Sequence, residues 1–220
     1  MYKKLIAKFW NNPEQVKRFG EDQPSEYLVK FFSMIKNPAD KKVLDIGCGG
    51  GRNIEILLKM RFDIFACDLH RKMVEPTKKR IMKINKKEAK KIILASMLFL
   101  PYHSNFFDYV VSNGVFHNAK SVNEFKLAIK ESARVLKDNG ELVLNMFSSR
   151  IIDPKLKLMK GEKFIYITRQ GLPLVLLSRQ YLTKILRENR LYVIDKITEK
   201  ETVVSTGKRA VLRGIFKKNK

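Results

Sequence analysis

The feature that most constrains this chain is a glycine-rich loop between a β-branched run and an amphipathic run. Residues 43–46 read Val-Leu-Asp-Ile, residues 47–51 read Gly-Cys-Gly-Gly-Gly, and residues 53–60 have apolar positions at helical spacing. Glycines at such a junction let the backbone pass close to a ligand, and the following helix N-terminus offers free N–H groups. The pattern therefore predicts a buried strand, a ligand-binding loop and a helix.

Beyond this loop, short apolar runs continue to alternate with longer amphipathic stretches. We expect five strands, at 43–46, 63–68, 92–95, 109–112 and 141–147, and helices at 53–60, from about Glu75 onward, and at 122–136 with Gly140 as the C-cap. This alternation predicts an α/β fold with a doubly wound, mostly parallel sheet of the Rossmann-like kind. In such a sheet the ligand lies beyond the carboxyl ends of the strands.

The C-terminal part has a different pattern. Ser178 is expected to cap a helix over 179–189, and residues 192–197 and 210–216 are expected to form strands joined by a polar turn that contains Thr, Ser and Gly. These two strands predict a C-terminal antiparallel hairpin at the edge of the sheet. The segment 148–177 between the two parts is too long for a plain connection.

The loop does not match two common nucleotide-binding motifs. A dinucleotide-binding fingerprint would have glycine where Arg52 stands, and a Walker A loop would end in Gly-Lys-Ser/Thr. The second predicted strand ends at Asp68, where a carboxylate suits a ribose diol because each oxygen can accept one hydroxyl. The alternative interpretation is a tight turn at 47–51 and a helix cap at Asp68.

These residues resemble the class I S-adenosylmethionine-dependent methyltransferases, and more closely their type 11 small-molecule branch. The resemblance rests on VLDIGCGGGRN (43–53), Asp68, LPYHSNFFDYVVSNGVFHN (100–118) and ARVLKDNGELVL (133–144). It covers roughly residues 40–147, is specific for fold and cofactor, and says little about the methyl acceptor.

The resemblance implies S-adenosyl-L-methionine as the cofactor and assigns residues to it. Asp45 would lie near the cofactor's amino group, Asp68 would hold the ribose hydroxyls, and Leu69 would pack on the adenine. The full set of implied cofactor-binding residues is Asp45, Gly47, Cys48, Gly49, Gly51, Asp68, Leu69, Ser96, Met97 and Asn113. Ser96 stands where the family often has an aspartate that touches the adenine amino group.

The acceptor side is less defined by the sequence. His117 follows the fourth predicted strand, so it is the candidate catalytic base, with a pocket-lining role or a loop role as alternatives. The other candidates for the acceptor pocket are Trp10, Phe19, Phe116 and Tyr166. Packing on the sheet edge is the alternative for the N-terminal aromatic residues. Cys48, Cys67 and the scattered acids show no metal-ligand spacing, so no metal site is predicted.

We therefore expect a single methyltransferase domain over residues 1–220, which divides into four parts. These are an N-terminal helical lid (1–40), a cofactor-binding core (41–147), a substrate cap insertion (148–177) and a helix with a C-terminal hairpin (178–220). The predicted activity is methyl transfer to a small organic molecule at O, N or S. The alternatives are an RNA (tRNA or rRNA) methyltransferase and a catalytically inactive cofactor-binding partner subunit.

The charge balance bears on the partners. Lys and Arg number 45 against 22 Asp and Glu, which gives a net charge of +23. This charge fits either a self-repelling surface or an anionic partner such as RNA. The basic run 71–91 is expected on the outer face, away from the acceptor, so RNA binding is disfavoured. The apolar run 92–102 is too short to span a bilayer, no secretory signal is visible, and a cytoplasmic location is predicted. The oligomeric state is not predicted.

Overall fold

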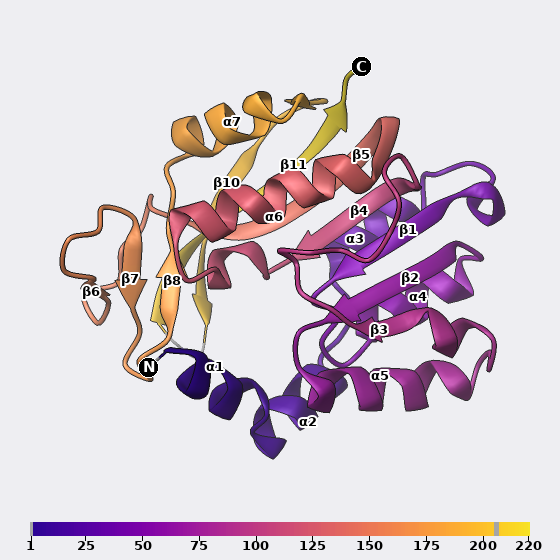
Figure 1. Cartoon of the computed structure of the whole chain (residues 1–220), viewed down its shortest axis with the longest axis horizontal. Coiled ribbons are helices and arrows are strands. Elements are labelled where there is room, and N and C mark those ends of the chain that lie inside the picture. The colour runs from indigo at the N-terminus through magenta and orange to yellow at the C-terminus, as the bar shows by residue number, and fades with distance from the viewer. Residues whose placement is uncertain (1, 205–206) are drawn as a thin grey trace.

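The computed structural model describes residues 2–204 and 207–220, which form one large sheet flanked by helices (Figure 1). The helices are α1 (Tyr2–Trp10), α2 (Pro13–Glu21), α3 (Glu26–Phe32), α4 (Arg52–Lys59), α5 (Arg71–Met82), α6 (Val122–Val135) and α7 (Arg179–Glu188). Short 3-10 helices are η1 (Pro38–Asp40), η2 (Glu88–Lys91) and η3 (Phe116–Asn118). Among the helices in these ranges, none is both long enough and apolar enough to cross a membrane.

The large sheet runs in the order β10-β11-β5-β4-β1-β2-β3, and β9 also pairs with β11. Its strands are β1 (Lys42–Ile46), β2 (Asp63–Asp68), β3 (Ile92–Leu94), β4 (Phe107–Asn113), β5 (Leu136–Ser148), β9 (Leu191–Val193), β10 (Thr198–Val204) and β11 (Gly207–Lys218). The strands β1 to β5 are parallel, whereas β11 is antiparallel to β5, β9 and β10. The predicted mostly parallel Rossmann-like sheet with antiparallel C-terminal strands is confirmed.

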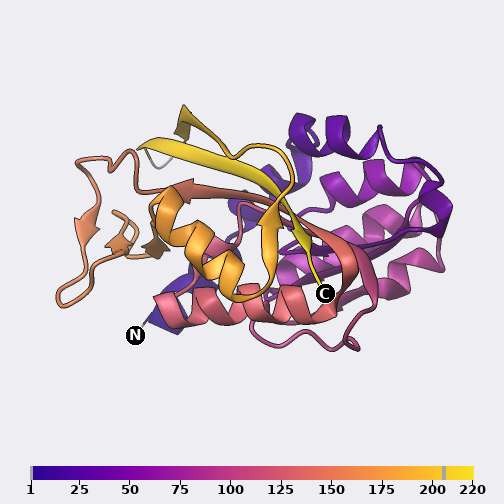
Figure 2. The same ribbon diagram turned by 90° about the horizontal axis from the view of Figure 1, so that it is seen from above.

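The two faces of the sheet are buried by different helices, as the alternation of side chains along a strand requires. Leu44 and Ile46 belong to one core with residues of α6 and α7, which Figure 2 shows together on one side of the sheet. Val43 and Ile64 belong to a second core with residues of α3, α4 and α5. Both faces are covered, which is why these strands read as nearly continuous apolar runs in the sequence.

Two expected helix boundaries are wrong. Helix α5 begins at Arg71 and contains Pro76, because the His70 carbonyl already accepts the N–H groups of Met73 and Val74 and so closes a turn before the proline. The proline costs one internal hydrogen bond without preventing this start. Helix α6 ends at Val135 and passes directly into β5, so Gly140 lies in a strand and is not a C-cap. Asn139 takes the left-handed conformation there, with a φ of 63°.

The C-terminal hairpin is also shifted from its expected register. Residues 192 and 193 pair with the end of β11, and the main partner of β11 is the polar strand β10. An edge strand exposes much of its surface, so β10 (Thr-Glu-Lys-Glu-Thr-Val-Val) lacks the apolar pattern by which buried strands are found. Part of the predicted Thr/Ser/Gly turn, residues 205–206, lies outside the described residues.

The insertion between β5 and α7 carries its own small antiparallel sheet in the order β6-β7-β8. Its strands are β6 (Lys157–Leu158), β7 (Ile165–Ile167) and β8 (Pro173–Val175). Figure 1 shows this sheet beyond the N-terminal end of α6, near α1 and far from α5. Buried Ile165 and Val175 join the core beneath α6, while Leu156, Leu174 and Leu176 form a separate apolar cluster.

Candidate cofactor and acceptor site

The glycine loop turns sharply from β1 into α4 and lies against two other elements. Gly47 has a φ of 71°, and a Cβ built on it would lie 2.4 Å from Cγ2 of Val115. Gly51 has a φ of 78°, and its Cβ would lie 2.8 Å from Cγ2 of Thr77. Only glycine takes these conformations without strain and without a clash with the side chains of Val115 and Thr77. The Gly47 and Cys48 N–H groups both donate to the Cys67 carbonyl, which ties the loop to β2.

Asp68, at the end of β2, faces the loop and is 8% exposed. Its Oδ1 accepts the His70 N–H at 2.9 Å, and its Oδ2 accepts the Gly49 N–H at 3.1 Å. Burial raises the pKa of this carboxyl, and the hydrogen bonds from backbone N–H groups oppose that rise. Each carboxylate oxygen keeps a further lone pair, so the side chain can still accept two ligand hydroxyls.

Asp45, near the end of β1, is a buried carboxyl without a full set of partners. It is 2% exposed, and its Oδ2 has no hydrogen-bond partner. Burial, together with repulsion from Asp68, raises the pKa of Asp45 to about 7, although Arg52 opposes this rise. An ionised carboxyl buried without a full set of partners lowers the stability of the ligand-free protein, and it suits a cationic group of a ligand.

A cavity of about 730 Å³ lies at this edge of the sheet. The predicted cofactor residues in its wall are Gly47, Cys48, Gly49, Asp68, Leu69, Ser96, Met97 and Asn113. Asp45 and Gly51 do not line it, although the neighbouring Ile46 and Gly50 do. The structure thus brings most of the predicted set to one cavity, and their individual roles toward a cofactor remain predictions.

Two of these residues already have partners within the protein. Ser96 Oγ accepts the Leu98 N–H at 3.1 Å, so the turn after β3 is held by its own side chain. Asn113 Oδ1 accepts from Asn145 Nδ2 at 2.7 Å, which links the ends of β4 and β5. Each side chain keeps further hydrogen-bonding capacity, which a ligand could use together with nearby backbone groups.

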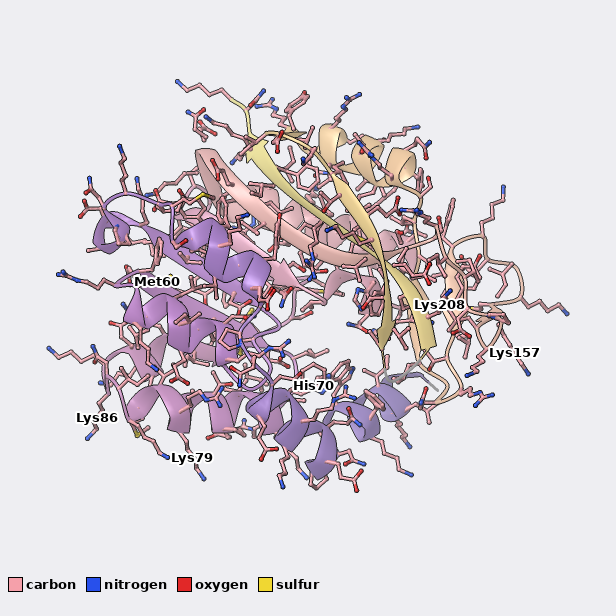
Figure 3. The ribbon with its side chains drawn as sticks, turned by 180° about the vertical axis from the view of Figure 1, so that it is seen from behind. Met60, His70, Lys79, Lys86, Lys157 and Lys208 are labelled. Carbon is pink, nitrogen blue, oxygen red and sulfur yellow. The ribbon has the colours of Figure 1, made fainter. Side chains whose placement is uncertain are left out.

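The N-terminal helices α1 and α2 supply the opposite wall of the cavity. Trp10 and Phe19 both line it, with ring centroids 5.3 Å apart. The Trp10 ring also stacks on His70, which follows β2, at 6.4 Å. Figure 3 shows the labelled His70 beside these helices. The structure therefore places both predicted N-terminal aromatic residues over the cavity rather than on the sheet edge.

His117 and Phe116 do not lie in the cavity wall. Both are buried in η3, at 4% and 0% exposed. The His117 ring stacks on Phe147 with centroids 4.2 Å apart, and its Nδ1 accepts the Phe147 N–H at 3.2 Å. Burial and the nearby Arg209 lower the pKa of His117 to about 3. The structure thus does not bring these two side chains to the cavity wall, because η3 turns them into the core, and a catalytic role for His117 stays a prediction.

We expect His117→Asn to reduce the loss of stability on acidification. The folded-state pKa of His117 lies below its ordinary value of 6.5, so between pH 6.5 and 3 the unfolded chain binds a proton that the folded protein excludes. From pH 7.5 to pH 5 this costs the wild type about 2 kcal/mol, and an asparagine oxygen can replace Nδ1 as acceptor without titrating. Urea unfolding of both proteins at the two pH values measures the difference. Equal losses would contradict the neutral buried imidazole.

Tyr166 and the rest of segment 148–177 also lie outside the cavity wall. Tyr166 pairs with Leu158 and Leu174 in the small sheet and packs against the separate apolar cluster of Leu156, Leu174 and Leu176. The described lining residues include none from 148–177. The structure thus does not bring Tyr166 to the acceptor pocket, and a cap role for this segment stays a prediction.

Several residues of the cavity wall were not predicted from the sequence. Lys120, just before α6, and Glu124, in its first turn, line it, with Lys120 Nζ 2.9 Å from Glu124 Oε1. The Ser121 side chain caps this helix, and that capping pattern was readable from the sequence. Ile6 and Ala7 line the cavity from α1, where only helical spacing pointed to a buried face.

The comparisons with known proteins agree with this geometry. Residues 44–144, from β1 to β5, match the family described as methyltransferase domain, type 11. This chain belongs to the class I S-adenosylmethionine-dependent methyltransferases. The structure is similar to that of a SAM-dependent methyltransferase from Methanosarcina mazei, with a TM-score of 0.73 and 20% identity over 90% of this chain and 99% of that one.

Two relatives of this methyltransferase illustrate the range of acceptors among similar sequences. One is the tRNA (carboxymethyluridine(34)-5-O)-methyltransferase of Arabidopsis thaliana, 27% identical over 119 residues, which are 54% of this chain and 27% of that protein. Another is the ubiquinone/menaquinone biosynthesis C-methyltransferase of Wigglesworthia glossinidia brevipalpis, 28% identical over 138 residues, which are 61% of this chain and 54% of that protein. The chain thus spans between about a quarter and a half of these relatives.

The residues of this methyltransferase fit the cofactor of its family. The orphaned Oδ2 of Asp45, behind the cavity-lining Ile46 and Gly47, suits a positive amino group, and Gly47 exposes its backbone to the cavity. Asp68 keeps acceptor capacity for a ribose diol. Leu69, with 55% of its surface exposed in the cavity wall, offers an apolar surface to an adenine ring.

Proposed function

We propose that this protein transfers a methyl group from S-adenosylmethionine to a small organic molecule that binds beneath helices α1 and α2. The observation that carries the proposal is the position of Trp10 and Phe19. These rings line the cavity, with Phe19 packed beside the glycine loop, and would give the acceptor side an aromatic wall. A cavity of about 730 Å³ is within the usual range for small-molecule sites, and it has room for a cofactor and a compact acceptor.

The cofactor half would be held by the ends of the first parallel strands. Asp45 would meet the cofactor's amino group, Asp68 its ribose, and Leu69 with Met97 its adenine. The bound cofactor supplies an electrophilic methyl group on a sulfonium. The protein's own contribution is to fix the acceptor in line with that methyl and to exclude water from both.

The acceptor half would combine apolar and polar walls. Trp10 and Phe19 offer flat apolar surface from the lid, and Leu98 faces the same cavity. The paired Lys120 and Glu124 at the start of α6 can donate to and accept from a polar group of the acceptor. This combination favours a partly apolar molecule with at least one hydroxyl, amine or carbonyl group.

The distribution of basic residues supports a small acceptor over RNA. The basic run 71–91 includes α5 and η2, and its first two cations, Arg71 and Lys72, line the cavity, contrary to the expected outward position of the whole run. Figure 3 shows the labelled Lys79 and Lys86 pointing outward at the rim of the molecule, away from His70. A substrate RNA is better served by basic and aromatic side chains that surround the cavity mouth. RNA methylation remains the second candidate function, favoured by the net charge of +23 and by the tRNA methyltransferase relative.

One experiment separates these two candidates. Purified protein is incubated with S-adenosylmethionine carrying a labelled methyl group and with either a low-molecular-weight metabolite extract or total RNA at about 150 mM salt. We expect label in the extract and none in RNA, since phosphate contacts alone weaken steeply with salt. Stoichiometric labelling of RNA at one site would overturn the small-molecule proposal. Asp68→Ala serves as the cofactor-deficient control.

The inactive-subunit alternative is tested by calorimetry. A protein that has lost its cofactor site should not bind S-adenosylhomocysteine. We expect this protein to bind it with a micromolar Kd, which corresponds to a binding free energy of about −8 kcal/mol. Binding without methyl transfer to any fraction of the extract would favour a partner subunit over an enzyme.

A further inference from the structure

Helix α2 and the glycine loop meet through two glycines. A Cβ on Gly50 would lie 2.4 Å from Cα of Gly20 and 2.5 Å from the Phe19 carbonyl oxygen, so these backbones touch directly. Gly50 does not have a positive φ, unlike its neighbours Gly49 and Gly51. Its lack of a side chain therefore serves this contact and not the turn of the loop.

The side chain of Arg80 joins the same two backbones. From α5 its Nη1 donates to the Gly50 carbonyl at 2.9 Å, and its Nη2 donates to the Gly20 carbonyl. Its Nε lies 3.3 Å from Oε2 of Glu55, which keeps the guanidinium plane in place. A planar guanidinium can direct several N–H groups to separate acceptors at once, which a lysine ammonium on a flexible stem does less well.

The bridged segment leads directly to the acceptor wall. Gly20 follows Phe19, whose ring lines the cavity and lies 5.3 Å from the Trp10 ring. A second link reinforces the first, because Arg52 Nη1 lies 2.8 Å from Asp22 Oδ2 just after α2. Both links connect the lid to the half of the site that holds the cofactor.

We propose that Arg80 is a positioning residue that clasps α2 onto the glycine loop and thereby sets the Trp10–Phe19 wall of the acceptor pocket. The clasp makes the lid position depend on the conformation of the cofactor loop, so acceptor binding and cofactor binding are coupled. The proposal rests on the proposed function for the identity of the two ligands. It singles out one cation among the ten in the basic run 71–91.

The test uses Trp10, which is the single tryptophan of the chain. In Arg80→Ala we expect Trp10 emission to shift to longer wavelength and acrylamide quenching to rise several-fold, because the lid loses its clasp. Lys79→Ala is the matched control, since it removes an exposed cation from the adjacent position of the same helix. We expect Arg80→Lys to resemble Arg80→Ala, because one ammonium does not reproduce the bridge.

A second pair of variants tests the contact without removing Arg80. Gly50→Ala places a methyl group into the backbone of Gly20 and should expose Trp10 as Arg80→Ala does. Gly20→Ala is its control, because a Cβ at that position has nothing within 4 Å and should leave the emission unchanged. This pair keeps the test valid if Arg80→Ala fails to fold.

Saturating S-adenosylhomocysteine provides the coupling measurement. We expect it to reduce acrylamide quenching of Trp10 in the wild type and in Lys79→Ala, and to have little effect in Arg80→Ala or Gly50→Ala. A purely structural role for Arg80 would lower the melting temperature and leave Trp10 emission unchanged in the folded variant, which would overturn the proposal. Wild-type behaviour of Arg80→Lys would also overturn it. If the wild type did not bind S-adenosylhomocysteine, the proposed function would fail, while the emission of the free proteins would still test the clasp.

Discussion

Asp45→Asn is expected to stabilise the ligand-free protein at pH 8 while weakening its binding of S-adenosylmethionine. Burial raises the pKa of Asp45 to about 7, so above that pH the folded protein carries a buried charge whose Oδ2 has no partner. A rise from 3.8 to about 7 corresponds to about 4 kcal/mol of folding free energy lost at pH 8. A neutral amide of similar shape avoids this loss.

The pH dependence of this effect has a defined sign. Between pH 4 and pH 7 the folded state keeps a proton on Asp45 that the unfolded chain releases, so this carboxyl makes the wild type less stable as the pH rises. The stability advantage of Asp45→Asn should therefore be largest at pH 8 and should vanish toward pH 4. Denaturant unfolding at pH 4.5, 6 and 8 measures it, with Asp40→Asn as a control at a surface carboxyl. An advantage that stayed constant with pH would contradict the buried charge.

We expect the same carboxyl to make cofactor affinity depend on pH. A positive amino group binds best to ionised Asp45, so calorimetry should show affinity rising from pH 6 to pH 8 in the wild type. We expect no such rise from this site in Asp45→Asn, and an affinity at pH 8 lower by about 10- to 100-fold, the scale of a charge-assisted hydrogen bond. A residue that destabilises the free fold and favours the ligand is typical of a binding site.

The parts of the fold that were predicted are those with local causes. The glycine loop, Asp68 and the buried parallel strands depend on turn geometry and on burial of both sheet faces, and both leave a pattern in consecutive residues. The strand β10 left no such pattern, because its partner β11 supplies the hydrogen bonds and its side chains face water. Its place could be known only from tertiary pairing.

In the candidate site, too, the features that depend on tertiary packing could not be predicted from the sequence. His117 was selected because it follows β4, but the direction in which η3 turns is set by packing against Phe147 and β8, far away in the sequence. Gly20 was overlooked, although a glycine in an amphipathic helix is a recognisable sign of close backbone contact. Arg80 could not be told from the other cations of its helix without the positions of Gly20 and Gly50.

Asp68→Ala is expected to weaken S-adenosylhomocysteine binding by about 3 kcal/mol, or roughly 100-fold, because the ribose would lose two hydrogen bonds to a charged acceptor. The substitution also frees the Gly49 and His70 N–H groups that the carboxylate now accepts. Asp68→Asn separates these effects, because its oxygen keeps one of the two backbone bonds and accepts one hydroxyl. Its affinity should lie between those of the wild type and Asp68→Ala.

The choice of nucleoside isolates the ribose contact in these variants. S-Adenosylhomocysteine is compared with its 2′,3′-dideoxy analogue by calorimetry at pH 7.5. The wild type should lose most of its affinity for the analogue, whereas Asp68→Ala should bind both ligands about equally, since it has no carboxylate for the hydroxyls to reach. If Asp68→Ala still preferred the diol as strongly as the wild type does, the ribose would be held by another group, and Asp68 would serve only to fix the backbone around Gly49 and His70.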